Sequence, residues 1–318
     1  MRNEKKYIFG VDVGGTNIKL GMFDSDANLI EKCEFATPIK DVCANMVKTI
    51  NENILALLTK RGESSESIIG VGIGFPSAVE YDGYISDTTN LDLVDCNPSR
   101  DLSLMLGVPV FSENDANIAA LGEFVRGAGQ GYSNMVMITL GTGLGGGIVW
   151  DGRLLRSPRC GIGEIGHIRI ETNEKEYCGC GKRGCLEQYA SATGVVKMAR
   201  EKLAESNENS VLRGITLSSK AVFDAAKSGD VLATQVLKRF GDYLGLGLGD
   251  AATILDPDVF VIGGGVSKAG EMIIDLLMPA FLENTTPVSR KVEFRMAQLG
   301  NDAGIYGAAA FVKEQLAK

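Results

Sequence analysis

Short apolar runs separated by glycine-rich turns open the chain. The runs at residues 8–13, 18–23 and 29–35 have the length of β-strands, and residues 12–16 between the first two form a glycine turn. Runs of this kind predict a strand that enters the turn and strands that return from it. From about residue 42 to 59 the apolar positions recur at helical spacing, which predicts an amphipathic helix.

The second half of the chain repeats this opening. After two further apolar runs at 68–73 and 108–111, and a helix-like stretch at 116–124, residues 135–140 are again apolar. Residues 141–147 form a second glycine turn, and a strand returns at 148–150 before the hairpin residues Asp151 and Gly152. The repeat predicts two related α/β domains that face each other.

The C-terminal part combines a glycine-rich helix with a last strand. Residues 240–255 contain four glycines, each of which costs a helix about 1 kcal/mol relative to alanine. We still expect a helix, because Asp256 and Pro257 suit its end, and we expect the glycines to mark close packing or a nearby ligand. A strand at 259–262 then leads into a third glycine cluster and a helix, and a final helix spans about 304–316.

Composition and charge narrow the class of protein. The 318 residues are 45% hydrophobic and 23% charged, which suits one large or two ordinary globular domains. A net charge of −8 and a pI near 5.0 repel nucleic acid and anionic lipid. No apolar stretch approaches the roughly 18–20 residues that span a membrane, and the first residues form no signal-peptide core. We expect a cytoplasmic protein that binds neither nucleic acid nor membrane.

The glycine turns are candidates for holding a polyphosphate. Their backbone N–H groups can point at phosphate oxygens, and a carboxylate at a strand end can hold Mg²⁺ through water. A third cluster, after a strand, suits the adenosine side, and no P-loop sequence is present. For any one turn alone, an ordinary hairpin is the alternative. The candidate residues are Asp12, Gly14, Gly15, Thr16, Asn17 and Lys19 in the first turn, Gly141, Thr142 and Gly143 in the second, and Gly263, Gly264 and Gly265 in the third.

A polar segment at residues 113–117 lies between a predicted strand and a predicted helix. Asp115 is a candidate general base that accepts the proton of an attacking hydroxyl, and Asn114 is a candidate for holding sugar hydroxyls. Asn and Asp are also the residues that favour a helix N-cap, so capping is the alternative role.

The most specific pattern is a set of zinc-ligand residues. His167 is the only histidine, and Cys178, Cys180 and Cys185 follow it at C-x-C-x₄-C spacing. Three thiolates and one imidazole make a closed tetrahedral zinc site, and a closed site is structural. Unbound thiols are the alternative, since a cytosolic disulfide is unusual.

Two carboxylates accompany these ligands. Glu164 precedes His167 by three residues, and Glu187 follows Cys185 by two. Carboxylates and an imidazole are suitable hydrogen-bond partners for sugar hydroxyls, and a zinc-bound histidine keeps one N–H as a donor. Each glutamate alone would more often be an ordinary surface residue.

Together these motifs resemble the ROK family of sugar kinases and repressors, within the actin-like ATPase-domain superfamily. The resemblance runs from Asp12 to Gly307, and its most specific part is the segment from Glu164 to Glu187. It implies two ribonuclease-H-like α/β domains with a cleft between them. We expect an N-terminal domain of residues 1–117, joined by about 304–318, and a larger C-terminal domain of 118–303 with the zinc loop.

The same resemblance implies roles for particular residues. It makes Asp115 the base and adds Asn90 as a sugar contact, although Thr89 stands where many family members have proline. The pattern is most similar to the glucokinase branch, which implies transfer of phosphate from Mg-ATP to glucose by a homodimer. A kinase for N-acetylmannosamine, allose or fructose is the alternative. A sugar-responsive transcriptional regulator without its DNA-binding domain is a remote alternative. Such a regulator needs a helix-turn-helix domain before the first strand, and here that strand begins near Tyr7.

Overall fold

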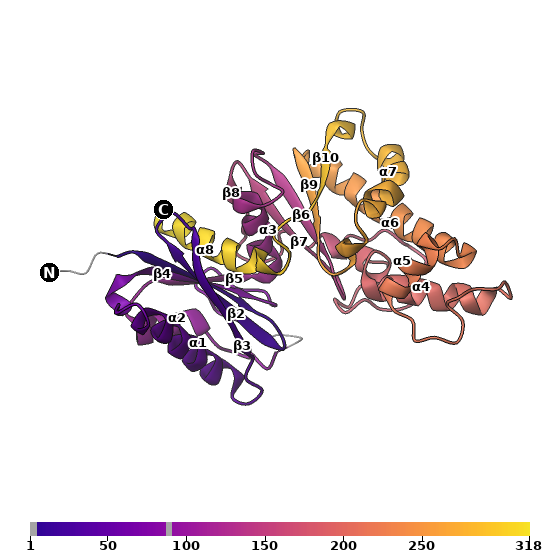
Figure 1. Ribbon diagram of the computed structural model, residues 1–318. Helices are drawn as coiled ribbons and strands as arrows, with labels where there is room; N and C mark the ends of the chain where they lie inside the picture. The colour runs from indigo at the N-terminus through magenta and orange to yellow at the C-terminus, as the bar shows by residue number, and fades with distance from the viewer. Residues whose placement is uncertain (1–4, 87–90) are drawn as a thin grey trace. The chain divides into compact units, whose positions relative to one another are not determined.

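Two five-stranded sheets organise the chain in a computed structural model that describes residues 5–86 and 91–318 (Figure 1). The first sheet has the order β3-β2-β1-β4-β5, and the second has the order β10-β9-β6-β7-β8. The strands are β1 (Tyr7–Val13), β2 (Asn17–Asp24), β3 (Leu29–Ala36), β4 (Ile68–Phe75), β5 (Val110–Asn114), β6 (Met135–Leu140), β7 (Leu144–Trp150), β8 (Arg153–Leu154), β9 (Val259–Gly263) and β10 (Glu293–Met296).

The two sheets share one topology. β1 pairs antiparallel with β2 and parallel with β4, and β4 pairs parallel with β5. In the second sheet β6 lies between β7 and β9, while β9 pairs parallel with both β6 and β10. Strand β1, which enters the first glycine turn, thus corresponds to strand β6, which enters the second. The predicted repeat and the α/β class are confirmed.

Helices cover these sheets. The α-helices are α1 (Val42–Thr59), α2 (Pro98–Leu106), α3 (Asp115–Arg126), α4 (Ala192–Glu205), α5 (Ser219–Lys227), α6 (Val231–Leu255), α7 (Met272–Asn284) and α8 (Ala303–Leu316). Short 3₁₀ turns are η1 (Ser65–Ser67), η2 (Ile165–His167), η3 (Leu186–Gln188), η4 (Val266–Ala269), η5 (Ser289–Lys291) and η6 (Gly300–Asp302).

The chain divides into two compact units. The first contains the residues up to Gly131, together with Gly147–Ile162 and Gln298–Lys318, and the second contains Tyr132–Gly146 and Gly163–Ala297. The boundary expected between residues 117 and 118 lies inside α3. Since α3 packs along α8, both helices belong to the first unit, which extends to Gly131 after α3 and resumes at Gln298 before α8.

The first sheet has an apolar layer on each face. On one face α1 and α2 cover a core that includes Phe9, Leu20 and Ile73. On the other face α8 lies against the sheet (Figure 1). Its apolar residues, including Ile305 and Val312, form a core cluster with Ile8 and Phe23. Strands buried on both faces read as continuous apolar runs, which is why the sequence located them.

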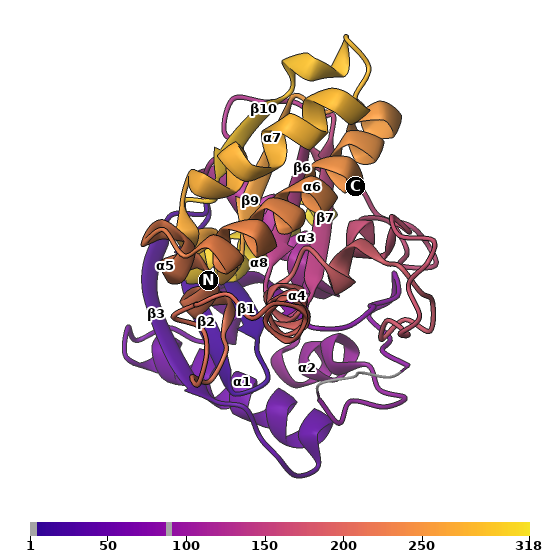
Figure 2. The same ribbon diagram turned by 90° about the vertical axis from the view of Figure 1, so that its right-hand side faces the viewer.

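The second unit confirms the glycine-rich helix and explains its composition. α6 runs alongside α7 (Figure 2). A Cβ atom on Gly241 would lie 2.2 Å from the carbonyl oxygen of Leu276, and one on Gly245 would lie 2.3 Å from that of Leu277. A Cβ atom on Gly247 would meet the side chain of Leu186 at 2.5 Å. The glycines permit close packing, and this gain offsets their cost within the helix.

Three predicted bounds need correction. β5 begins at Val110 rather than 108, next to Pro109, which has no N–H to donate. β7 begins at Leu144 rather than 148, so the second turn is shorter than its glycine run. α6 begins at Val231 rather than 240. Asp230 caps this N-terminus, since its side chain accepts from the N–H of Ala233. The sequence reasoning also missed α2, α4, α5, β8 and β10.

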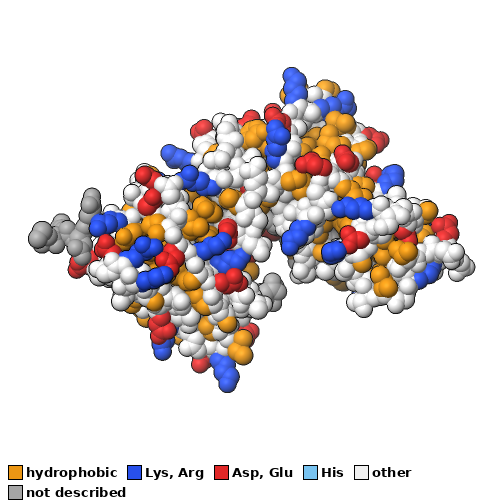
Figure 3. Space-filling model, in the orientation of Figure 1, with side chains coloured by type: hydrophobic (Ala, Val, Ile, Leu, Met, Phe, Trp, Pro, Cys, Tyr) orange, Lys and Arg blue, Asp and Glu red, His pale blue; other side chains and the backbone are white. Residues whose placement is uncertain are grey.

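The surface carries charges of both signs. On the face drawn in Figure 3, acidic and basic side chains are interspersed among apolar ones. Among residues 5–86 and 91–318, every helix is too short or too polar to serve as a membrane span.

Candidate functional site

Asp12 lies near the end of β1, where α8 approaches the sheet. It pairs with Lys19 of β2 in the antiparallel register. A Cβ atom on Gly304, in the first turn of α8, would lie 2.5 Å from the carboxyl carbon of Asp12. Burial raises the pKa of Asp12 above its usual value, and the positive charge of Lys19 opposes that rise. The carboxylate is therefore held in a tight, poorly solvated place.

The first glycine turn is closed by one backbone hydrogen bond and one from a side chain. The N–H of Gly14 donates to the carbonyl of Asn17 at 3.0 Å, and the hydroxyl of Thr37 donates to the carbonyl of Gly14 at 2.7 Å. Gly15 is exposed, with open space where a Cβ atom would stand, and Thr16 is exposed beside it. Together with Asn17, these two residues are the exposed part of the turn.

Two of the predicted cofactor residues have protein partners instead. The side-chain amide of Asn17 donates to Glu34 at 2.7 Å. The ammonium of Lys19 donates to the carbonyl of Asn301 at 2.7 Å. In this structure both side chains brace the turn against neighbouring segments of the same unit.

The structure separates the two roles considered for Asp115. Asn114 is the N-cap of α3, and its side-chain oxygen accepts from the N–H groups of Ala116 and Asn117. Asp115 is the first helical residue, and its carboxylate accepts from the N–H of Ala116 at 2.8 Å. The capping alternative therefore applies to Asn114, and Asp115 is left for another role.

Asp115 also has the electrostatics of a proton acceptor. Burial and, after it, the negative charge of Asp12 raise the pKa of Asp115 to about 6. A carboxyl group with a pKa near neutrality is ionised at pH 7 and still basic enough to take a proton. Asp12 and Asp115 therefore form an interacting pair within the first unit.

In the second unit, Glu187 joins two candidate motifs. One of its carboxylate oxygens accepts from the N–H of Leu144 at 2.9 Å, just after the second glycine turn. The other lies 3.6 Å from the sulfur of Cys178. A Cβ atom on Gly143 would stand 2.1 Å from the Glu187 carboxylate. The sequence indicated Glu187 only as a sugar contact and gave no signal of this link.

The second turn is tied down on its other side too. The carbonyl of Gly141 accepts from the N–H of Ala192 at 2.8 Å, and that of Thr142 accepts from the hydroxyl of Thr193 at 2.7 Å. A Cβ atom on Gly141 would find no atom nearer than 4.0 Å. This turn is anchored at the start of α4 and leaves space above Gly141.

The third glycine cluster follows β9. Gly264 has a φ of +86°, and a Cβ atom there would lie 2.5 Å from the carbonyl oxygen of Leu140, so only glycine suits the position. Gly263 packs against Met137, whereas a Cβ atom on Gly265 would stand in open space. Gly263 is buried, whereas Gly264 and Gly265 are exposed and accessible to a ligand.

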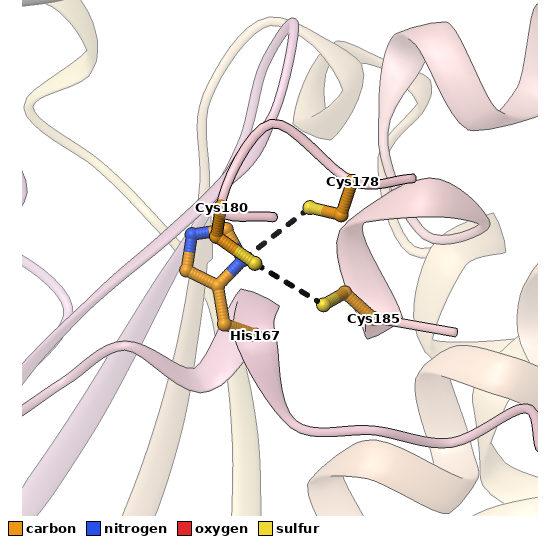
Figure 4. Close-up of side chains that lie close together, drawn as sticks. All are labelled: His167, Cys178, Cys180 and Cys185. Carbon is orange, nitrogen blue, oxygen red and sulfur yellow. Dashed lines mark hydrogen bonds between the residues drawn. The ribbon is translucent and has the colours of Figure 1, made fainter. Parts of the chain in front are cut away.

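The four predicted metal ligands lie together in the second unit (Figure 4). Their ligand atoms are all within 4.8 Å of one another. The sulfurs of Cys180 and Cys185 are 3.6 Å apart, and the sulfur of Cys178 is 3.7 Å from Nδ1 of His167. Tetrahedral zinc with Zn–S bonds of about 2.3 Å places its ligands about 3.8 Å apart. The cluster therefore suits zinc.

The loop that carries these ligands is shaped by glycine. Gly181 and Gly184 have positive φ angles of 81° and 76°. The N–H of Gly181 donates to the carbonyl of Cys178 at 2.9 Å, which folds the loop back on itself. This tight turn brings the ligands of a short segment around one point.

Glu164 lies beside the cluster. Its carboxylate is 3.7 Å from Nε2 of His167, the ring nitrogen that faces away from Cys178. Glu164 is exposed, and Gly166 lets η2 lie against the backbone of Leu144. Glu164, His167 and Glu187 thus border the same zinc loop. The predicted sugar contact Asn90, with Thr89, lies outside the described residues.

Comparison with known proteins gives one consistent answer. The sequence model of the ROK family matches residues 8–315. A glucokinase of Halalkalibacterium halodurans is 40% identical over 98% of this chain and 96% of its own.

Solved structures agree. A ROK hexokinase from Thermus thermophilus has a TM-score of 0.85 and 30% identity over 98% of this chain and 99% of its own. A ROK family glucokinase from Streptomyces griseus, solved with glucose and AMPPNP, has a TM-score of 0.75 and 33% identity over 97% and 99%. With a family match that spans nearly every residue and the two-sheet fold in common, this chain belongs to the ROK family.

Proposed function

We propose that this protein is an ATP-dependent glucokinase, which transfers the terminal phosphate of ATP to glucose and releases ADP and glucose 6-phosphate. The observation that carries the proposal is the environment of Asp115. It is the first residue of α3, it is not needed as a cap, and its pKa of about 6 suits a general base. We infer glucose as the substrate from the similarity to glucokinases.

In the proposed reaction Asp115 accepts the proton of the sugar 6-hydroxyl as its oxygen attacks the γ-phosphorus of ATP. The bond between that phosphorus and the β–γ bridging oxygen breaks, and ADP leaves. Asn114, Glu164, His167 and Glu187 would orient the sugar hydroxyls, with Asn90 as a further candidate. Positioning and electrostatic stabilisation account for most of the catalysis in phosphoryl transfer.

The nucleotide would bind to the glycine turns. Gly15, Thr16 and the turn at Gly141–Gly143 offer backbone N–H groups to phosphate oxygens, and Gly265 offers space for the adenosine side. Asp12 would hold Mg²⁺ through water. When bound, Mg²⁺ neutralises charge that develops on the phosphates.

Four other properties are part of the proposal. Zinc would bind His167, Cys178, Cys180 and Cys185 and hold the sugar-binding loop in shape. The seven free cysteines suit a reducing compartment such as the cytoplasm. The family resemblance implies that the protein forms a homodimer. Its net charge of −8 argues against nucleic acid as a partner.

A coupled ADP-release assay tests the function. Purified protein with ATP and Mg²⁺ is given glucose, N-acetylmannosamine, allose or fructose, and kcat/KM is compared. We expect glucose to give the highest value. A higher value for another sugar would retain the kinase and reject glucose as the substrate, whereas ADP release that ignores every sugar would reject both.

The metal assignment predicts about one zinc per chain, because a closed site with four ligands holds one ion. Cys180→Ser should lose the zinc, lower the melting temperature and weaken sugar binding, since metal binding is coupled to folding. Cys33→Ser is the matched control, because Cys33 lies on β3 outside the cluster. Elemental analysis of unchelated protein decides the matter, and zinc-free native protein would contradict the assignment.

The nucleotide turn predicts a selective effect at Gly141. Gly143 is unsuitable for this test, because its added side chain would strike Glu187. In Gly141→Val the new side chain would enter space that phosphate requires, so ATP affinity should fall while the melting temperature stays near that of wild type. Isothermal titration with AMPPNP measures the first and a thermal melt the second. Unchanged affinity would remove this turn from the phosphate site.

The base predicts both a mutant phenotype and a pH profile. Asp115→Asn should keep the fold and lower kcat by about 10²–10⁴-fold, the usual contribution of general acid–base catalysis. Since the ionised carboxylate is the active form, kcat/KM of the wild type should fall as the pH drops through about 6.

A matched control is Asp101→Asn, the same change in the first turn of α2, where kcat should be retained. Steady-state kinetics across pH 5 to 8 measure the profile. A folded Asp115→Asn protein with near-normal kcat would leave this mechanism without its base.

A further inference from the structure

A buried ion pair includes Glu113, the first residue of the segment 113–117 that carries the proposed base Asp115. The guanidinium Nε of Arg156 donates to Oε2 of Glu113, and the two side chains are 9% and 5% exposed. Glu113 is the last residue but one of β5, two residues before Asp115. Arg156 comes from the segment after β8, so the pair joins two parts of the first unit that are distant in sequence.

The other oxygen of Glu113 holds the catalytic segment itself. Oε1 accepts from the backbone N–H of Asn114 at 2.9 Å and from the side-chain amide of Asn117 at 3.0 Å. Asn114 and Asn117 lie on either side of Asp115, at the end of β5 and in the first turn of α3. One carboxylate therefore fastens the backbone before Asp115 to the helical turn after it.

Arg156 is itself held in place by aromatic rings. Its guanidinium carbon lies 4.5 Å from the ring centroid of Tyr81 and 5.1 Å from that of Phe311 on α8. Both are within the range of a cation–π contact. Because these contacts restrict Arg156, the position of Glu113 is restricted too.

Stability alone does not account for this pair. A buried ion pair gains little over apolar residues of the same volume, because desolvating two charges offsets their attraction. Its specific effect here is geometric: it fixes one oxygen of Glu113 so that the other can brace Asn114 and Asn117. A general base must lie within hydrogen-bond reach of its proton, so small displacements of Asp115 are costly.

We propose that Arg156 is a positioning residue for the reaction, acting through Glu113 to hold the segment of residues 113–117 that presents Asp115. The inference rests on the proposed function, since it takes Asp115 as the base. Arg156 belongs to none of the sequence motifs, and the proposed mechanism places neither sugar nor nucleotide in contact with it.

The test is Arg156→Met, which keeps a long apolar side chain and removes the anchor. We expect kcat at saturating sugar and Mg-ATP to fall about 10²-fold, the scale of a misplacement near 1 Å. The affinity for AMPPNP should stay within about twofold, since the nucleotide turns do not include the pair. Activity is expressed per AMPPNP-binding site, so that unfolded protein does not count as lost catalysis.

Two further variants make the result specific. Arg156→Lys keeps the charge but not the planar fork, so it should recover part of kcat. Arg153→Met is the matched control, the same change at an exposed residue three positions away, and its kcat should equal that of the wild type.

If Arg156→Met does not fold because Glu113 is left uncompensated, the double variant Glu113→Gln, Arg156→Met removes both charges. Its glutamine oxygen can still accept from Asn114 and Asn117 but lacks its anchor, so kcat should remain low in folded protein. The sugar used is whichever the wild type phosphorylates best, which separates this test from the choice of substrate. Wild-type kcat in folded Arg156→Met, or in the folded double variant, would overturn the inference.

Discussion

The first unit depends on glycines that let helix α8 pack closely against strands β1 and β4 and against helix α3. A Cβ atom on Gly10 of β1 or Gly72 of β4 would lie 2.1 and 2.0 Å from carbonyl oxygens of α8. On the side of α3, a Cβ atom on Gly122 or Gly307 would lie 2.2 and 1.7 Å from backbone oxygens of the facing helix. Backbone therefore meets backbone on both sides of α8, and a single methyl group at any of the four positions would force these elements apart.

This close packing explains the electrostatics of the two aspartates. Because Gly304 has no side chain, the first turn of α8 can lie against Asp12, and α3, which packs along α8, begins with Asp115. The same contacts that exclude water raise the pKa of both carboxyl groups, and the charge of Asp12 raises that of Asp115 further. The placement of the proposed base thus depends on residues that carry no chemistry of their own.

The sequence indicated the candidate site residues but not the contacts that support them. Glycine turns, the Cys₃His cluster and Asp115 have local spacing that reflects their chemistry, so a pattern within a few residues identifies them. The links of Glu113 to Arg156 and of Glu187 to Leu144 join residues 43 positions apart in each case, and no local pattern encodes them. The helices α4 and α5 were also missed, although their buried residues recur at helical spacing, as Val195, Met198 and Ala199 do in α4.

Three carboxylates of the first unit show how surroundings separate structural from chemical roles. Glu123 is fully buried and accepts from the N–H groups of Ala128, Gln298 and Leu299, so its lone pairs are used by the backbone. Glu113 has Arg156 as a cationic partner. Asp115 lies beside another acid, Asp12, and the hydrogen bonds to its carboxylate come from residues 114–116. Burial and the charge of Asp12 raise the pKa of Asp115, which favours the role of proton acceptor proposed for it.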